Sequence, residues 1–240
     1  MKKKIVTLLI AGTLALSITA CGGSGEDTSS ADDSNTSEES SETDVSPAEE
    51  PEQVIAPYET DLTCGYYVAG VHIPEGIYNV TVNSGLGSIM TKSGVTSSMG
   101  SGTGVEYAAS FDNLTLQNGD TLTVTQSLNI HLASNEAYYS TMSEYDNPAE
   151  EEKDLSAGNY IVGQDIQPGL YDVTLVSGDL VNINTTDYVV STSLTNNEIL
   201  KESTATSCKN MELLEGQTLS VQSGTVKMTP CADNVPLTPQ

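Results

Sequence analysis

Few side chains in this chain could carry covalent or metal chemistry. The 240 residues include two histidines, His72 and His131, and four cysteines. Nucleophilic catalysis needs an activated serine or cysteine with a positioned base, and zinc needs closely spaced cysteines and histidines. Asp165, Asp172 and Asp179 could offer oxygen ligands to calcium, but no D-x-D-x-D-G loop holds them. The sequence therefore predicts no catalytic residue, no metal site and no cofactor.

The two histidines have structural interpretations instead. His72 takes the place that Asp165 holds in an internal repeat described below, so we expect a turn residue that hydrogen-bonds the backbone. His131 alternates with Ile130 and Leu132, which predicts a strand position that faces solvent.

The cysteines leave more than one arrangement open. If Cys21 is modified as argued below, three remain, and an odd number leaves at least one thiol without a partner inside the chain. Cys208 and Cys231 lie in the same half of the chain, where a disulfide would close a loop of modest length and stabilise by about 3 kcal/mol. Cys64 is then either a free, partly buried thiol or the partner of a cysteine in the other half.

The N-terminus has the features of a secretory leader. Lys2–Lys4 is a short basic segment, and Ile5–Ile18 is an apolar run that is too short to span a bilayer as a mature helix. Ile18-Thr19-Ala20-Cys21 resembles the lipobox of bacterial lipoproteins. The resemblance implies cleavage before Cys21 and a diacylglyceryl group on its sulfur. Two acyl chains anchor stably, so we expect the mature protein on the extracellular face of the cell membrane, with a Gram-positive surface favoured.

The charge of the chain restricts its partners. Asp and Glu number 33 against 8 Lys, which gives a formal net charge of -25. This argues against nucleic-acid binding and against electrostatic attraction to anionic lipid, so the membrane is a partner only through the lipid on Cys21. Residues 22–60 contain no basic side chain and few apolar ones, which predicts a disordered acidic tether.

An internal repeat organises the remainder. Asp61–Val82 and Asp154–Leu175 share 10 of 22 residues at an offset of 93. A second block, Asn113–Val124, matches Asn210–Val221 at an offset of 97. The sequence thus predicts two copies of one module. The predicted division is a signal peptide at 1–20, a lipidated tether at 21–60, module 1 at 61–134, an acidic linker at 135–153, module 2 at 154–232 and a tail at 233–240.

Short runs rich in Val, Ile, Thr and Tyr, separated by Gly and Pro, predict strands in both modules, and no helical period occurs in either. We expect an all-β chain with two tandem antiparallel β-sandwiches, jelly-roll-like or immunoglobulin-like. The absence of Trp argues against a true immunoglobulin domain. Asn118-Gly119-Asp120 and Glu215-Gly216-Gln217 are predicted hairpin turns. Residues 85–104, rich in Gly and Ser, predict a long, loosely packed loop.

The pattern G-x-Y-x-V-G-x-D-I-x-P-G-x-Y resembles a β-rich repeat of lipoproteins and surface proteins of Gram-positive bacteria, which implies architecture and location but no reaction. His72 departs from its Asp position. The tyrosines that recur in the repeat are expected in the core, which leaves Tyr66, Tyr107 and Tyr188 for sugar binding. We therefore expect a non-enzymatic binding or structural protein. The alternative is a lipoprotein that binds cell-wall glycan or peptidoglycan, and a surface protein is a further partner to consider.

Overall fold

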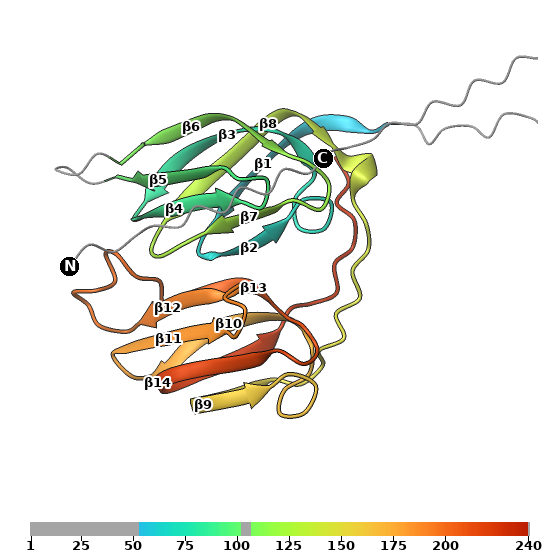
Figure 1. The fold of residues 1–240 in the computed structure, drawn as a ribbon. Helices are drawn as coiled ribbons and strands as arrows, with labels where there is room; N and C mark the ends of the chain where they lie inside the picture. Colours follow the sequence, from blue (N-terminus) through green and yellow to red (C-terminus); the bar gives the residue numbers. More distant parts are fainter. Residues whose placement is uncertain (1–52, 102–106, 240) are drawn as a thin grey trace, which may run out of the picture. The chain divides into compact units, whose positions relative to one another are not determined.

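Runs of β-branched and aromatic residues alternate between buried and exposed positions along this chain. The computed structural model describes residues 53–101 and 107–239, and within them it contains strands β1 to β14 and one short 3-10 turn, η1, at Tyr139–Thr141 (Figure 1). In β3, Tyr78 and Val80 are fully buried, whereas Ile77 is 57% exposed. The predicted all-β class is confirmed.

The first eight strands form the first module, a β-sandwich. One sheet has the order β1-β8-β3-β6, and the strands of the other have the order β2-β7-β4-β5. Neighbours within both sheets are antiparallel. This is the strand order of a jelly roll and differs from that of an immunoglobulin domain. The bounds are β1 Ile55–Leu62, β2 Gly65–Val68, β3 Glu75–Ser84, β4 Leu86–Thr91, β5 Thr96–Gly100, β6 Ser110–Leu116, β7 Thr121–Val124 and β8 Asn129–Tyr138.

The remaining strands form the second module with the same topology. The long strand β14 pairs with β11 along its first half and with β10 along its second half, and β9 accompanies both halves. Thus β9 occupies the positions that β1 and β2 have in the first module, and β14 occupies the positions of β7 and β8. The order β12-β11-β14-β10-β13 therefore contains both layers of a jelly roll. The bounds are β9 Lys153–Ile161, β10 Gly169–Ser177, β11 Leu180–Thr185, β12 Ser191–Thr195, β13 Ser207–Leu213 and β14 Thr218–Pro230.

The strand β14 bends, and so it contributes to both layers of the second module, as β7 and β8 together do in the first. Ser223 and Gly224 of β14 have φ angles of 62° and 73°, and the register with β9 shifts at this place. Gln126, at the equivalent position between β7 and β8, has a φ of 59°. A positive φ turns the chain sharply, so these residues carry it from one sheet to the other.

Each module has its own apolar core. The first is centred on Tyr78, Ile89 and Leu132, all fully buried, and the second on Tyr171 and Ile183. One residue is exceptional, because Cys64 follows β1 of the first module and yet packs in the core of the second. The second core, from its first residue to its last, consists of Cys64, Ala149, Leu155, Val162, Ile166, Tyr171, Val173, Leu175, Val181, Ile183, Val190, Leu194, Ala205, Cys208, Met211, Leu213, Leu219, Val221, Val226 and Met228.

Two predicted boundaries differ from the structure. β1 begins at Ile55, inside the predicted tether, because Tyr58 packs against the first core and the strand pairs with β8. β8 runs to Tyr138, inside the predicted linker, where Ala137 is fully buried. The leader, Cys21 and the tether up to residue 52 lie outside the described residues, so lipidation stays a prediction. In the described part of the chain, no helix is long and apolar enough to cross a membrane.

The loosely packed loop predicted at 85–104 is wrong. This region holds β4 and β5, and Ile89 and Met99 within it are fully buried. A Cβ at Gly87 would lie 2.2 Å from the carbonyl oxygen of Thr125, so this glycine permits a close approach between strands. Gly85, whose Cβ would lie 2.1 Å from the carbonyl oxygen of Ser127, has the same role.

The predicted hairpin turns are tight turns of another kind. The N–H of Asp120 donates to the carbonyl of Gln117 at 2.8 Å, and that of Gln217 donates to Leu214 at 3.1 Å. The glycines between them, Gly119 and Gly216, both have a φ of 81° and so take the third position of a type II turn. The first turn joins β6 to β7, which belong to different sheets, and the second joins β13, which pairs with β10, to the half of β14 that pairs with β11. They are corners of the sandwich and close no hairpin.

Candidate functional site

The two modules meet where an edge strand of one pairs with an edge strand of the other. β13 pairs with β2 in parallel, with Lys209 opposite Gly65, and the N–H of Lys209 donates to the carbonyl of Cys64 at 2.9 Å (Figure 1). A Cβ at Gly65 would lie 2.9 Å from the Lys209 carbonyl oxygen. Glycine at this position therefore allows the strands to approach each other. We call this pairing the joint.

Side chains extend the contact beyond the joint. The Tyr66 hydroxyl accepts from the N–H of Ser191 at 3.1 Å. The Ser127 hydroxyl donates to the carbonyl of Glu202 at 2.6 Å. The amide of Asn234, in the C-terminal tail, donates to the carbonyl of Val71. Three segments of the first module thus contact two segments of the second module and the tail.

The acidic linker is docked against the second module. The Asn147 amide donates to the carbonyls of Leu170 and Cys231 at 2.8 and 2.9 Å, and its oxygen accepts from the N–H of Leu170 at 2.9 Å. Ala149 is buried in the second core. The linker meets the tail as well, because the backbone groups of Tyr145 and Asn234 bond each other in both directions. The linker is therefore held both by the second module and by the tail.

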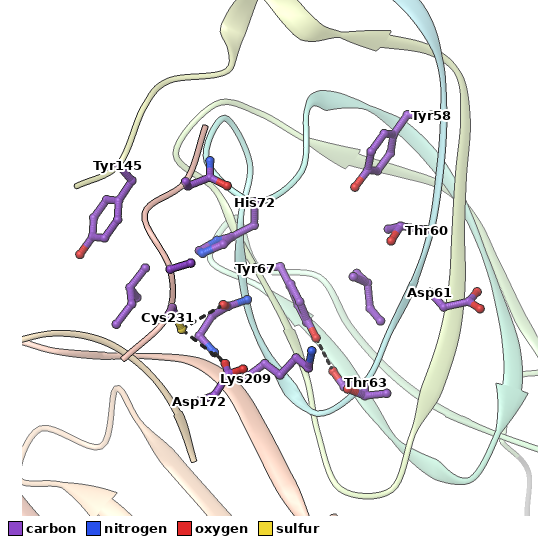
Figure 2. Close-up of a pocket in the computed structure, with 15 residues that line it drawn as sticks. Tyr58, Thr60, Asp61, Thr63, Tyr67, His72, Tyr145, Asp172, Lys209 and Cys231 are labelled. Atoms are coloured by element: carbon purple, nitrogen blue, oxygen red, sulfur yellow. Dashed lines mark hydrogen bonds between the residues drawn. The ribbon is translucent and has the colours of Figure 1, made fainter. Parts of the chain in front are cut away.

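A cleft of about 500 Å³ lies beside the joint, and both modules line it (Figure 2). The first module contributes residues of β1 and β2 and the loop that carries His72. The second contributes residues of β10 and β13, together with the linker and the tail. Its lining residues are Tyr58, Thr60, Asp61, Leu62, Thr63, Tyr67, His72, Tyr145, Leu170, Asp172, Lys209, Asn210, Cys231, Ala232 and Asn234.

His72 has a fixed structural role in the cleft wall. Its Nδ1 accepts the N–H of Val68 at 2.9 Å, as Asp165 Oδ2 accepts the N–H of Ile161 at 2.8 Å in the second module. The predicted turn role of His72 is confirmed. Burial lowers the pKa of His72, and the carboxylate of Asp172 opposes this shift. The imidazole is therefore neutral at neutral pH, with Nδ1 occupied as an acceptor.

The thiol of Cys231 is held in its protonated form. Its S–H donates to Asp172 Oδ1 at 3.4 Å and to Asn210 Oδ1 at 3.6 Å (Figure 2). Burial, followed by the negative charge of Asp172, raises the pKa of Cys231 to about 12. The thiolate is the nucleophilic form of cysteine, so the protonated Cys231 is a poor nucleophile.

The cleft can nevertheless recognise a polar ligand. Asp172 presents a carboxylate whose Oδ1 also accepts the N–H of Asn210 at 3.1 Å. The side chain of Lys209 is exposed and runs toward Tyr67 in Figure 2. The rings of Tyr58 and Tyr145 are half-buried in the wall. Charged donors and acceptors beside aromatic faces suit a ligand that both gives and takes hydrogen bonds.

Cys64 and Cys208 lie together across the joint. In the parallel register that pairs Gly65 with Lys209, the preceding residues, Cys64 and Cys208, also stand opposite each other. The two side chains are 4% and 1% exposed. Interaction with the neighbouring Cys208 thiol lowers the pKa of Cys64, and interaction with Cys64, followed by burial, raises the pKa of Cys208. The Thr192 hydroxyl contacts Cys64 Sγ at 3.7 Å.

The predicted pair Cys208 and Cys231 is not brought together. All three described cysteines are free thiols. Cys208 pairs opposite Val173 on one side of β10, and the N–H of Cys231 bonds the carbonyl of Leu170 on the other side. Two strand spacings amount to about 9.5 Å, whereas a disulfide requires Cα atoms about 4.4–6.8 Å apart. This arrangement argues against that bridge.

His131 lies outside the cleft, on the outer face of the first module. It faces Asp61 on the neighbouring strand, with Nδ1 at 2.8 Å from Oδ1, and its side chain is 37% exposed. The bond from His131, and then the bond from Asn83, lowers the pKa of Asp61. The predicted exposure of His131 is confirmed, and its contact with Asp61 is a hydrogen bond at the surface.

The repeated tyrosines serve the fold. The hydroxyl of each donates to the carbonyl of the residue four positions earlier, at 2.6 to 3.0 Å, and three of the four rings are buried. The four bonds run from Tyr67 to Thr63, from Tyr78 to Pro74, from Tyr160 to Ser156 and from Tyr171 to Gln167. Of the three tyrosines left for sugar binding, Tyr66 is engaged between the modules and Tyr188 is 73% exposed.

The three aspartates considered as calcium ligands have separate places in the structure. Asp165 caps its own turn, Asp172 lies in the cleft, and Asp179 accepts a bond from Thr195 through its carbonyl. Among residues 53–101 and 107–239, no group of three or more His, Cys, Asp or Glu side chains could hold a metal ion.

Sequence reasoning missed the cleft because distant segments build it. A difference between the two copies of the repeat could have indicated the residues of the cleft and the joint. Lys209 stands where the first copy has Asp112, and Cys64 stands where the second has Ala157.

Comparison with models of protein families, with curated proteins and with solved structures finds no match to this chain.

Proposed function

We propose that this chain is a lipid-anchored cell-surface protein that binds a ligand in the cleft between its modules and catalyses no reaction. The observation that carries the proposal is the cleft, to which both modules contribute polar side chains. The groups that could act as nucleophile or base are engaged elsewhere, since His72 accepts a backbone N–H and Cys231 stays protonated. What remains is suited to recognition.

The ligand class that fits best is a hydroxyl-rich glycan, such as a cell-wall or peptidoglycan fragment. Sugar hydroxyls donate to carboxylates and accept from ammonium groups, which Asp172 and Lys209 supply. The half-buried rings of Tyr58 and Tyr145 offer apolar faces for the carbon skeleton. A polyanion is disfavoured by the net charge of -25.

Calorimetric titration with soluble peptidoglycan fragments tests the cleft. Lys209→Gln and Asp172→Asn should each weaken binding about ten- to a hundredfold, because a hydrogen bond to a charged group is worth ~1.5–3 kcal/mol. Tyr188→Ala is the matched control, since Tyr188 is an exposed aromatic outside the cleft lining. Binding that survives both cleft substitutions but is lost in the control would refute the cleft and favour an exposed aromatic instead.

The anchoring part of the proposal rests on the leader and the lipobox at Cys21. Cys21→Ala should prevent lipidation, so the variant should leave the membrane fraction after cell breakage, whereas the parent chain should stay with it. Metabolic labelling with a fatty-acid analogue gives a second readout. A variant that still partitions with membranes would show that the anchor lies elsewhere.

A further inference from the structure

Two buried thiols face each other where the modules join. Cys64 and Cys208 precede the paired residues Gly65 and Lys209 in a parallel register. Neighbouring strands lie about 4.7–4.9 Å apart, which is within the range of Cα separations that disulfides span, about 4.4–6.8 Å. The Cys64 sulfur contacts the Thr192 hydroxyl at 3.7 Å, and both cysteines pack in the core of the second module, so the two side chains point to the same side of the joint.

The repeat supplies an internal comparison. The second module has Ala157 where the first has Cys64, and the first module has Phe111 where the second has Cys208. Cysteine therefore occurs at these two positions only in the copies whose edges form the joint. The equivalent edge strands β6 and β9 form no joint with another module, and they have no cysteine at these positions.

We propose that Cys64 and Cys208 form a disulfide that links the two modules covalently. The oxidant is a disulfide-bearing compound acting by thiol–disulfide exchange. The Cys64 thiolate attacks one sulfur of that disulfide and releases the first thiolate. The Cys208 thiolate then attacks the Cys64 sulfur of the mixed disulfide and releases the second. Both electrons end on the oxidant, whose two sulfur atoms leave as thiols with the two protons from the cysteines.

Two features favour this pair over the other pairings. The pKa of Cys64 is lowered, chiefly by its interaction with the neighbouring Cys208, and this favours the thiolate, which is the attacking form. Cys231 follows β14, on the side of β10 opposite β13, and its thiol is engaged by Asp172 and Asn210, so it stays the odd thiol. The secreted location predicted from the leader is a compartment where disulfides persist. A disulfide here would also fix the walls of the cleft, because Lys209 adjoins Cys208.

Refolding with peptide mapping tests the pairing. The full chain, purified in detergent and reduced in denaturant, is refolded in a buffer of reduced and oxidised glutathione, quenched with acid, alkylated and digested with pepsin at low pH. Most molecules should yield one peptide pair that links Cys64 to Cys208, with Cys231 alkylated. Cys231→Ser should leave that pair unchanged, and Cys64→Ser should leave Cys208 alkylated.

The alternatives give distinct maps. A peptide that links Cys208 to Cys231, or alkylation of both Cys64 and Cys208 in most molecules of the parent chain, would overturn the proposal. The parent chain is mapped directly, so the result does not depend on whether a cysteine variant folds. The melting temperature provides a second measure, which should be higher for the oxidised parent chain than for the same sample after reduction. These readouts do not involve the ligand, so failure of the disulfide and failure of the binding proposal are distinguishable.

Discussion

Four tyrosine hydroxyls in this protein make the same bond in four different surroundings, which allows a graded test of what such a bond contributes. Each donates to the carbonyl four residues earlier. Replacement of tyrosine by phenylalanine removes only the hydroxyl and keeps the ring. The variants Tyr67→Phe, Tyr78→Phe, Tyr160→Phe and Tyr171→Phe therefore compare one chemical change at four sites.

The expected magnitudes follow from the burial of each acceptor. Tyr78 is fully buried and its acceptor, Pro74, is also buried, so Tyr78→Phe leaves a carbonyl that water cannot reach. Such a group costs about 1–3 kcal/mol. Tyr171 is equally buried, but its acceptor residue, Gln167, is exposed. Tyr171→Phe should therefore cost only the net value of the bond, about 0.5–1.5 kcal/mol.

The remaining two variants complete the order. The acceptor residue of Tyr67, Thr63, is exposed, so Tyr67→Phe should resemble Tyr171→Phe. Tyr160 is half-buried and its bond to Ser156 lies at the surface, so Tyr160→Phe should cost less than about 0.5 kcal/mol. Urea denaturation followed by far-ultraviolet circular dichroism gives each free energy of unfolding, read from the transition of the module that carries the change.

The order of the four values is the decisive result. If Tyr78→Phe costs no more than Tyr160→Phe, then burial of the acceptor does not set the contribution of this bond, and the reasoning fails. A cost above about 4 kcal/mol for Tyr78→Phe would also refute it, because loss of one hydroxyl without a cavity cannot account for that value.

Three further predictions concern the cleft, the joint and the linker. Burial lowers the pKa of His72 in the folded state, so the stability that neutral His72 contributes should be complete above its ordinary pKa of ~6.5. This stability should be lost as the pH falls through the lower pKa of the folded state. His72→Asn, which keeps an acceptor, should reduce the loss, measured as the difference between urea midpoints at about pH 7.5 and pH 5. Gly65→Ala should destabilise by about 1–3 kcal/mol in the same assay, because its Cβ would meet the Lys209 carbonyl oxygen at 2.9 Å, whereas Gly158→Ala, with its nearest contact at 3.5 Å, should change stability by less than about 0.5 kcal/mol. Asn147→Ala should remove the bonds that dock the linker, lower the free energy of unfolding by about 2–4 kcal/mol and speed proteolysis between the modules.

Much of the fold could be predicted because the repeat carries its own markers. Tyr78 and Tyr171, with the glycines of the matching loops, indicated strands, corners and a core face before any pairing was known. The pairing itself was out of reach, since β1 pairs with β8 and β2 with β7 across most of a module. The choice between sandwich topologies depends on those long-range pairs, and alternation along one strand does not encode them.

The candidate site was less predictable for a related reason. Lys209 and Tyr58 are far apart in sequence, and each looks like an ordinary surface or strand residue by itself. The region from 85 to 104 was misread because Gly87 has two interpretations, a flexible loop or a close approach, and only the neighbouring strand distinguishes them. His72 was predicted correctly because Asp165, its equivalent, revealed the role that the position requires.

The differences between the two copies explain why the modules join once and in one order. Each copy has one edge like β2 and one edge like β13, so the same pairing could in principle continue from chain to chain without closing. The open edges lack the residues that make the joint. Asp112 and Phe111 stand on β6 where Lys209 and Cys208 stand on β13, and β9 has Asn159 where β2 has Tyr66. A second joint would lack Tyr66, whose hydroxyl bonds Ser191 in the existing joint. It would also place the carboxylate of Asp112 on the pairing edge, where it is repelled by other acidic side chains of the chain. Divergence of the repeat thus restricts the pairing to a single internal interface, the one that forms the cleft.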